Sequence, residues 1–197
     1  MTERRWQVLS AAAALFAARG FHDVGMRDIG QSLGLNPASL YHHFKSKDRA
    51  LLEICLVGHE RTLADLVTAL NEADSFVDRV GRLFRLHVIS LKDFGDFLQV
   101  YITQREQVPE AMAEPLRLGW TVYRTRLSQL LEDGVRSREV SPDVDLRHAS
   151  WMLIAVFRIL NELHQRGRAA ELEAFARSGA DLFIDGMRGA SAKTMDM

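Results

Sequence analysis

The side chains with the clearest chemistry lie in one stretch of the chain, MRDIGQSLGLNPASLYHHFKSK, which runs from Met26 to Lys47. Two overlapping sets of groups occur there. The side chains that can donate a hydrogen bond to a phosphate are those of Ser39, Tyr41, His43 and Lys47. The side chains that can meet base edges or thymine methyl groups in a major groove are those of Ala38, Tyr41 and His42. Both sets indicate recognition of duplex DNA.

The elements that must position these groups are two short helices joined by a tight turn. Apolar residues recur at the spacing of one helix face at Met26, Ile29 and Leu33. Gly34 then stands where a left-handed residue ends a helix. Asn36 and Pro37 have the residue types of a helix cap and a first helical position. Leu40 and Phe44 point inward from the second helix, so the stretch predicts a helix-turn-helix with a polar outer face.

A known family shows the same pattern. The run LGLNPASLYHHFKSKDRALL, preceded by AAAALFAARGF and MRDIG, resembles the TetR family of one-component bacterial repressors over about residues 5 to 55. The most specific part of the resemblance is the set Leu40, Tyr41, His43, Phe44, Ser46 and Lys47. The remainder of the chain is similar to the family only in its helical layout.

The resemblance implies a role for each matching residue. It implies base-facing positions for Pro37, Ala38, Tyr41 and His42. It implies a phosphate clamp formed by Ser39, His43 and Lys47, and we include Arg27 in the DNA-binding set. Two positions depart from the family, which usually has Thr followed by Ser or Thr where this chain has Val24 and Gly25. Gly25 can still cap a helix, but the hydroxyl-to-phosphate bond is lost and only backbone N–H groups remain there.

The function implied by the resemblance is transcriptional regulation. The expected protein is a homodimeric repressor that binds a palindromic operator and is released by a small hydrophobic effector. An activator and an architectural DNA-binding protein remain alternatives, and the number of dimers on the operator stays open. The alternative that does not bind DNA is a helical ligand-binding protein or an enzyme. No GxSxG, HExxH or CxxC motif supports an enzyme, and neither a cofactor nor a metal is expected.

Composition and charge fit this reading. Of 197 residues, 47% are hydrophobic and 26% are charged, and the net charge is −1. The charge is uneven, because residues 1–50 carry +3 and residues 51–197 carry −4. A basic head on an acidic body is compatible with a dimer that brings two heads to one duplex. Cys55 is the single cysteine, so the chain cannot form an internal disulfide, which is compatible with the reducing cytoplasm. The uncharged run after Arg5 imitates a secretory signal, but its removal would delete the helix that covers the helix-turn-helix.

The rest of the chain is expected to be helical throughout, with about nine helices. The first covers 3–19, and a long fourth helix runs to about residue 70 and joins the head to the body. The later helices are expected at 76–92, 94–108, 116–136, 145–166 and 170–188. The predicted domains are a DNA-binding domain at 1–47 and an effector-binding and dimerisation domain at 48–189, followed by a flexible tail at 190–197.

The last two helices are predicted to form the dimer interface. The helix at 145–166 is apolar nearly all round, so it must be covered on two sides. Together with the helix at 170–188 it would form a four-helix interface with a twofold axis. The candidate interface residues are Trp151, Ile154, Phe157, Phe175, Gly179, Leu182 and Phe183.

An effector pocket is predicted among the helices from 76 to 166, because their apolar faces are rich in aromatic residues and carry a few polar groups. The candidate ligand residues are Phe84, His87, Phe94, Phe97, Tyr101, Arg105, Trp120, Tyr123, Trp151 and Asn161. For the aromatic residues and His87, packing in the core is the alternative. The expected ligand is hydrophobic with one polar or anionic end, such as a fatty-acyl or steroid-like molecule.

Overall fold

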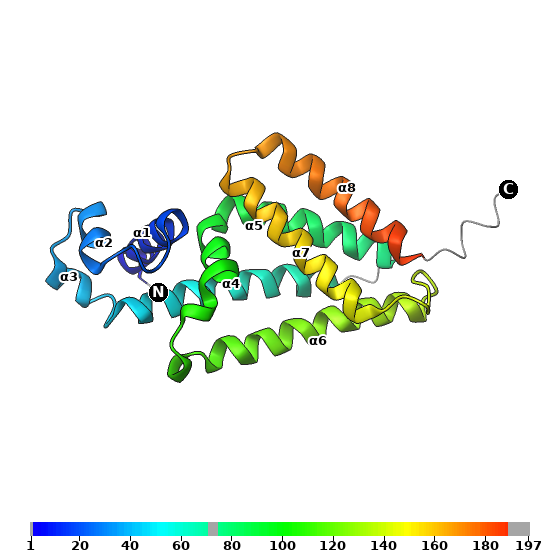
Figure 1. The fold of residues 1–197 in the computed structure, drawn as a ribbon, viewed down its shortest axis with the longest axis horizontal. Helices are drawn as coiled ribbons and strands as arrows, with labels where there is room; N and C mark the ends of the chain where they lie inside the picture. Colours follow the sequence, from blue (N-terminus) through cyan, green and yellow to red (C-terminus); the bar gives the residue numbers. More distant parts are fainter. Residues whose placement is uncertain (1, 71–74, 189–197) are drawn as a thin grey trace. The chain divides into compact units, whose positions relative to one another are not determined.

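The computed structural model describes residues 2–70 and 75–188, without the side chains of Pro37 and Ala38. This part of the chain is all helical, as predicted (Figure 1). The helices are α1 (Glu3–Arg19), α2 (Met26–Ser32), α3 (Pro37–Tyr41), α4 (Lys47–Leu70), α5 (Phe76–Gln104), η1 (Arg105–Gln107), η2 (Glu110–Met112), α6 (Glu114–Arg136), α7 (Leu146–Gln165) and α8 (Ala169–Met187). The predicted tail at 190–197 lies outside the described residues.

The predicted break between the helices at 76–92 and 94–108 lies inside α5. The two segments are separated at Phe94, as predicted, because its φ of −130° and ψ of 19° are not helical, although both parts carry the label α5. Gly95 follows directly, and a glycine weakens a helix at such a point. The second part ends at Gln104 and is followed by the 3₁₀ turn η1, short of the predicted end at 108. The described residues carry eight labelled α-helices, and the break in α5 accounts for the ninth helix that the sequence predicted.

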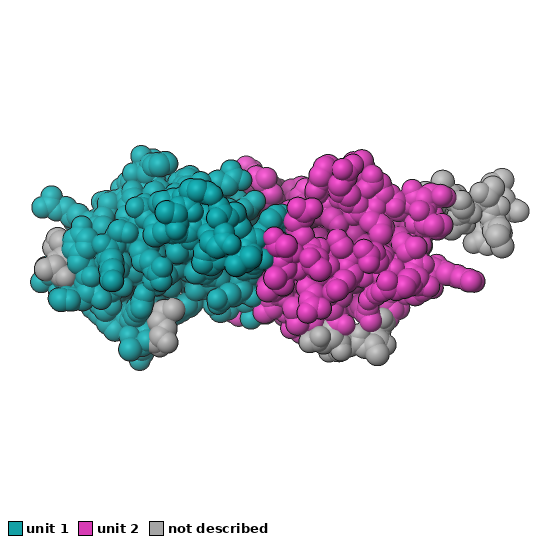
Figure 2. All heavy atoms as spheres, turned by 90° about the horizontal axis from the view of Figure 1, so that it is seen from below, with its two compact units in different colours: residues 1–61, 94–120 teal, residues 62–93, 121–197 magenta. Residues whose placement is uncertain are grey.

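The chain divides into two compact units, coloured separately in Figure 2. Unit 1 holds residues 1–61 and 94–120, and unit 2 holds residues 62–93 and 121–197. These units are defined by which residues pack together, whereas the predicted boundary at Lys47 divides the DNA-binding part of the chain from the effector-binding part. That functional boundary stays a prediction.

Unit 1 is built around the N-terminal head. Its core combines apolar side chains of α1, α2 and α3 with the second part of α5, and includes Val8, Phe16, Ile29, Leu40, Phe44, Phe97 and Val100. The ring of Trp6 stacks on Phe97 with a centroid separation of 5.0 Å. The amide of Gln104 donates to the carbonyl oxygen of Phe16 over 2.8 Å. The head is thus held by a helix segment that lies far along the sequence.

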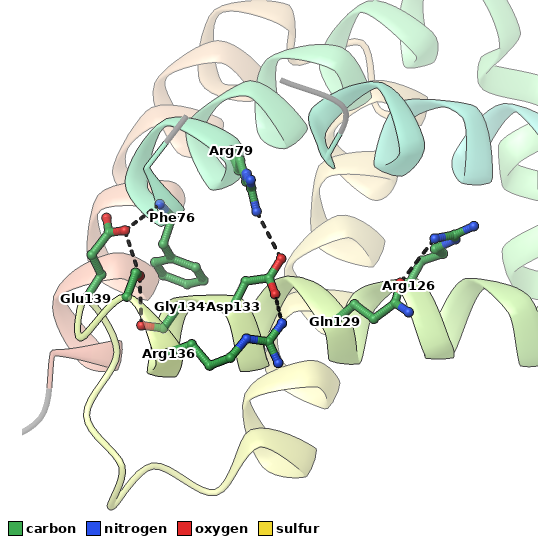
Figure 3. A network of polar contacts seen from close by, with 9 residues as sticks. Phe76, Arg79, Arg126, Gln129, Asp133, Gly134, Arg136 and Glu139 are labelled. Carbon is green, nitrogen blue, oxygen red and sulfur yellow. Dashed lines mark hydrogen bonds and ion pairs between the residues drawn. The ribbon is translucent and has the colours of Figure 1, made fainter. Parts of the chain in front are cut away.

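Unit 2 is a helical bundle in which α7 and α8 pack side by side (Figure 1). A carboxylate from the segment after α6 stabilises the start of α5, because Glu139 accepts a hydrogen bond from the backbone N–H group of Phe76 (Figure 3). It also accepts one from the backbone N–H group of Val77. Nearby, Asp133 pairs with both Arg79 and Arg136. This network joins the N-terminal end of α5 to the C-terminal end of α6. No helix in the described ranges is long and apolar enough to cross a membrane.

Candidate nucleic-acid interface

The second helix of the motif begins with the caps that the sequence predicts. The side-chain oxygen of Asn36 accepts from the backbone N–H of Ser39 over 2.8 Å, and Pro37 lies in the first turn. Gly34 has a φ of 65°, the left-handed conformation that a glycine adopts without strain. α3 itself is short, ending at Tyr41, and a hydrogen-bonded turn carries the chain on to Phe44. These local bonds fix the direction in which the outer side chains point.

For the side chains that the structure describes, the inner and outer faces of α3 and of the turn after it divide as predicted. Leu40 and Phe44 are buried, and the guanidinium of Arg5 lies 5.8 Å from the centroid of the Phe44 ring. On the outer side, Tyr41 is 54% exposed and His42 is also exposed. Ser39 and His43 are half-buried beside them. The rings of Tyr41 and His42 are thus exposed and could enter a DNA groove, and the hydrogen-bond donors of Ser39 and His43 lie beside them.

An ion-pair cluster joins α1 to α4 near the motif. Arg5 of α1 bonds to both carboxylate oxygens of Glu53 over 2.8 and 2.6 Å, and Arg49 bonds to the same carboxylate over 3.0 Å. Because Glu53 and Arg49 belong to α4, this cluster joins α1 to the long helix that follows the motif. A bidentate arginine–carboxylate pair fixes orientation as well as distance.

The first helix of the motif begins without a side-chain hydroxyl. The backbone N–H of Gly25 donates to the carboxylate of Asp28 over 2.7 Å, which completes a capping interaction that the sequence analysis missed. Asp28 lies three residues after the cap, so the spacing was a usable signal. Val24, where the family usually has a threonine, is fully buried. Arg27 is exposed on α2.

Lys47 does not point freely into solvent. Its ammonium donates to the carbonyl oxygens of Phe21 over 2.7 Å and of Val24 over 2.9 Å. It also lies 4.2 Å from the centroid of the Phe21 ring. Its predicted role as a phosphate partner stays a prediction, but two of its three N–H donors are engaged within the protein.

The predicted ligand residues fall into both units. Those in unit 1 are Phe94, Phe97, Tyr101, Arg105 and Trp120, and those in unit 2 are Phe84, His87, Tyr123, Trp151 and Asn161. Trp151 is 56% exposed on α7, so it lies on an outer surface of its unit. Phe84, Phe97, Tyr101 and Tyr123 are buried. The burial of these four side chains agrees with packing in the core, and their role in a ligand pocket stays a prediction.

In unit 1 a polar cluster surrounds Tyr101. The guanidinium of Arg105 lies 5.5 Å from the Tyr101 ring and 5.4 Å from the Trp120 ring. Nδ1 of His59 and the Tyr101 hydroxyl are hydrogen-bonded over 3.0 Å, and Nε2 of His59 is buried with no hydrogen-bond partner among the described residues. Burial lowers the pKa of His59 and raises that of Tyr101 to about 12. The sequence analysis did not select His59, although it lies one helical turn after Cys55 on an apolar face.

In unit 2 His87 is enclosed by aromatic residues. Its ring stacks on Phe157 with a centroid separation of 4.5 Å, and Phe84 meets the same phenylalanine edge to face. Burial lowers the pKa of His87 to about 4, although its hydrogen bond to the Phe157 backbone acts in the opposite direction. Phe84 also lines a groove of about 540 Å³ between α5 and α8, whose rim carries Arg85, Lys92 and Glu173.

The predicted dimer residues divide between the outer face and the core of unit 2. Phe157 and Phe183 are buried, so they offer little surface to a partner. Leu182 and Trp151 are well exposed, and Ile154, Phe175 and Gly179 are partly exposed. The sequence analysis missed Met152 and Ile159, which are 64% and 43% exposed on α7. Sequence periodicity could not separate two opposite faces on a helix that is apolar nearly all round.

The described residues contain no group of three or more His, Cys, Asp or Glu side chains placed to hold a metal ion. The geometry instead centres on an exposed pair of rings on a capped recognition helix. This fold and this surface define a helix-turn-helix transcriptional regulator.

Comparison with known proteins agrees with this class. The family model described as "Bacterial regulatory proteins, tetR family" matches residues 8–54. The chain is 30% identical to the HTH-type transcriptional regulator UidR of Escherichia coli K12, with coverage of 95% of this chain and 94% of the relative. It is 26% identical to the HTH-type transcriptional repressor KstR2 of Mycolicibacterium smegmatis, with coverage of 79% and 80%. The chain belongs to the TetR family.

Solved structures show the same fold. The TetR family regulator PfmR from Thermus thermophilus has a TM-score of 0.80 and 26% identity, with coverage of 96% of this chain and 98% of that chain. The ketosteroid transcriptional regulator KstR2 of Mycobacterium tuberculosis has a TM-score of 0.77 and 20% identity, with coverage of 91% and 95%.

Proposed function

We propose that this protein is a repressor that binds a palindromic operator as a homodimer in the cytoplasm and is released by a small hydrophobic effector. The observation that carries the proposal is the capped recognition helix α3 with the turn after it, in which Leu40 and Phe44 are buried while Tyr41 and His42 are exposed. Regulators among the relatives, including the KstR2 repressors, support a role without enzymatic activity.

The proposed contacts with DNA follow from the positions on α3. Tyr41 and His42 read base edges, with Pro37 and Ala38 at the start of the same helix. Ser39 and His43 contact phosphates on either side, and Arg27 adds a cation from α2. Phosphate contacts fix the register of the protein on the duplex, and base contacts supply the sequence preference.

The proposed dimer forms through the outer faces of α7 and α8. Four large apolar side chains, Trp151, Met152, Ile159 and Leu182, are exposed on these two neighbouring helices. Large contiguous apolar patches on a soluble protein mark interaction sites. A twofold interface presents the same patch on both subunits and so covers both patches at once.

The proposed effector is an amphipathic molecule of the fatty-acyl or steroid-like class. Its polar end would meet either the Arg105 cluster of unit 1 or the His87 cluster of unit 2. Arg105 is favoured for an anionic group, because a guanidinium group is a cation that matches a carboxylate or phosphate. Burial lowers the pKa of His87 to about 4, so its ring is neutral at pH 7. One structural relative, AibR, was solved with isovaleryl coenzyme A and operator DNA, so a member of this fold class binds an acyl compound.

The test is a footprint of the purified protein on DNA flanking its own gene, followed by titration of operator and random duplexes. A specific regulator should favour the operator by a factor of order 10³ or more. Equal affinity for both duplexes would favour an architectural protein, and no binding to either would favour the ligand-binding or enzymatic alternative. A reporter gene would separate repression from activation.

The effector is tested by a thermal-shift screen of acyl and steroid-like compounds. A hit should raise the melting temperature and release the operator, with Arg105→Ala weakening its effect more than His87→Ala does. A hit that releases DNA equally well from both variants would show that neither cluster holds its polar end.

A further inference from the structure

One ammonium group joins the two ends of the helix-turn-helix motif. Lys47 is the first residue of α4, directly after the motif, and Val24 lies just before Gly25, the cap of α2. The bond of 2.9 Å from Nζ of Lys47 to the carbonyl oxygen of Val24 therefore closes the whole motif into a loop. The second bond, of 2.7 Å to Phe21, extends the tie to the connection that follows α1.

The residues that accept these bonds are themselves firmly held. Val24 is fully buried, and Phe21 is buried and meets Phe16 edge to face with a centroid separation of 5.4 Å. The ammonium lies against the Phe21 ring as well, so three contacts fix one charge. Hydrogen bonds from a charged donor are stronger than those between neutral groups. The tie thus joins the start of α4 to a rigid part of the head.

The position of Gly25 makes such a tie important in this chain. Gly25 separates Val24 from α2 and is extended, with φ −97° and ψ 165°, and it has no side chain that could hold the helix start. The direction in which α2 leaves the head therefore depends on Asp28, which caps it, and on the bond that holds Val24. α3 packs on α2, so the same direction sets where Tyr41 and His42 lie.

We propose that Lys47 is a positioning residue for DNA reading: its ammonium sets the orientation of the motif on the head by tying Val24 and Phe21 to α4. This inference rests on the proposed DNA-binding function and concerns a role apart from direct contact with phosphate. A phosphate contact contributes equally to all DNA sequences. A positioning residue contributes more to the operator, because base contacts need the correct orientation.

The experiment compares Lys47→Met with Lys45→Met in the full-length protein. Lys47→Met keeps an unbranched apolar side chain and removes the charge and the donors. Lys45→Met removes the same charge from an exposed lysine two residues earlier. We measure the melting temperature without DNA, and the affinity for operator and random duplexes at several salt concentrations.

Lys47→Met should melt a few degrees lower than the unmodified protein and lose about tenfold in the ratio of operator to random affinity. The Lys45→Met protein should keep the melting temperature and the affinity ratio of the unmodified protein. A Lys47→Met protein with an unchanged melting temperature and ratio, and a salt slope lower by about one unit, would identify a simple phosphate contact and overturn the proposal.

Lys47→Arg decides the question if Lys47→Met does not fold. It retains a charge for phosphate, but its planar fork does not replace a compact ammonium between two carbonyl groups. The Lys47→Arg protein should therefore show a reduced ratio of operator to random affinity. Full retention of both this ratio and the melting temperature would contradict the proposal. If the unmodified protein prefers no operator, the proposed function fails, and the melting temperatures still test the tie.

Discussion

Tyr41 and His42 are adjacent in the sequence but differ in what holds them. Tyr41 is the last residue of α3, and His42 begins the turn that leads to the buried Phe44. Neighbouring helical residues point about 100° apart, so the two rings address different parts of a groove. Each should therefore affect a different base pair.

His42→Ala should change the preference for one base-pair position in each half-site, at a cost of about 1–3 kcal/mol in discrimination. The measurement is competition among operators that carry single base-pair substitutions. His43→Ala is the matched control, because its proposed phosphate contact should weaken all duplexes to a similar extent. A uniform loss for His42→Ala would place it among the phosphate contacts.

Glu139 supports a prediction about pH. Partial burial acts to raise its pKa, but hydrogen bonds from Phe76, Ser137 and Val77 outweigh burial and hold the pKa below 4.5. Because the folded pKa is the lower one, its stabilising effect is present above the unfolded pKa and is lost as the pH falls through the folded pKa. Glu139→Gln should lower the free energy of unfolding at pH 7 by about 0.3–1 kcal/mol.

Denaturant titrations of both proteins at neutral and acidic pH check this expectation. The difference between them should shrink as the pH falls, because the carboxyl group becomes neutral in the unmodified protein. Glu132→Gln, at an exposed position on α6, is the control and should have little effect at either pH. A difference that persists in acid would mean that the charge of Glu139 is not what stabilises α5.

The sequence predicted those residue roles that depend on near neighbours. Asn36, Pro37 and Gly34 act within a few residues of the backbone they support, so their types and spacing were sufficient. Lys47 and His59 act on partners that are 23 to 42 positions away in the chain. A contact between such distant positions leaves no pattern in the neighbouring sequence, so the roles of Lys47 and His59 can be assigned only from the folded structure.

Among the elements of unit 1, α4 and α5 approach so closely that one position excludes a side chain. A Cβ atom on Gly58 would lie 2.6 Å from the carbonyl oxygen of Phe97 and 2.8 Å from the Cβ atom of Tyr101. A Cβ atom on Gly119 would similarly lie 2.3 Å from Nε2 of His59. The glycines therefore set the spacing of α4 from α5 and α6 in this unit.

Gly58→Ala should destabilise the protein by about 1–3 kcal/mol, because backbone atoms must move to admit the methyl group. Gly81→Ala is the matched control in α5, since the nearest atom to its new Cβ would be the flexible end of Arg85 at 3.5 Å. It should stabilise the helix by about 0.5–1 kcal/mol. Thermal unfolding of the two variants checks the expected opposite signs, and equal signs would contradict the close approach of α4 and α5.

The helices themselves were predictable from periodicity and caps, with α1 matching the predicted range 3–19. The break inside α5 was predicted as well, since one helix was expected to end at 92 and the next to begin at 94, and the non-helical angles of Phe94 lie at that junction. The division of the predicted ligand residues between two units was not predictable. Periodicity gives the apolar face of a helix and not the unit to which each part of that face belongs.

For the whole molecule, the outer face of α7 and α8 is the surface proposed to form the dimer interface. Leu182 is 73% exposed on α8, and Leu118 is 59% exposed on α6. The two leucines have similar exposure, but Leu182 belongs to the predicted interface and Leu118 does not. They therefore form a matched pair for testing which surface is covered in solution.

Leu182→Glu should break the dimer or unfold the body, and operator affinity should fall steeply, because two half-sites are no longer held by one assembly. Leu118→Glu should remain dimeric. Light scattering and operator titration of both variants check this expectation. A dimer that survives Leu182→Glu and dissociates with Leu118→Glu would move the interface to α6, and a monomeric unmodified protein would remove the basis of the prediction.

The discontinuous composition of unit 1 has a consequence during synthesis. Residues 1–61 leave the ribosome before residues 94–120, which complete the same unit, have been made. At a synthesis rate of about 5–20 residues per second, on the order of several seconds pass before Phe97, Val100 and Leu116 are made and can pack on the nascent head. Until then the apolar side chains that these residues cover are open to chaperones and to other nascent chains. We therefore expect the head to reach its native packing only after Trp120 has emerged from the ribosomal tunnel.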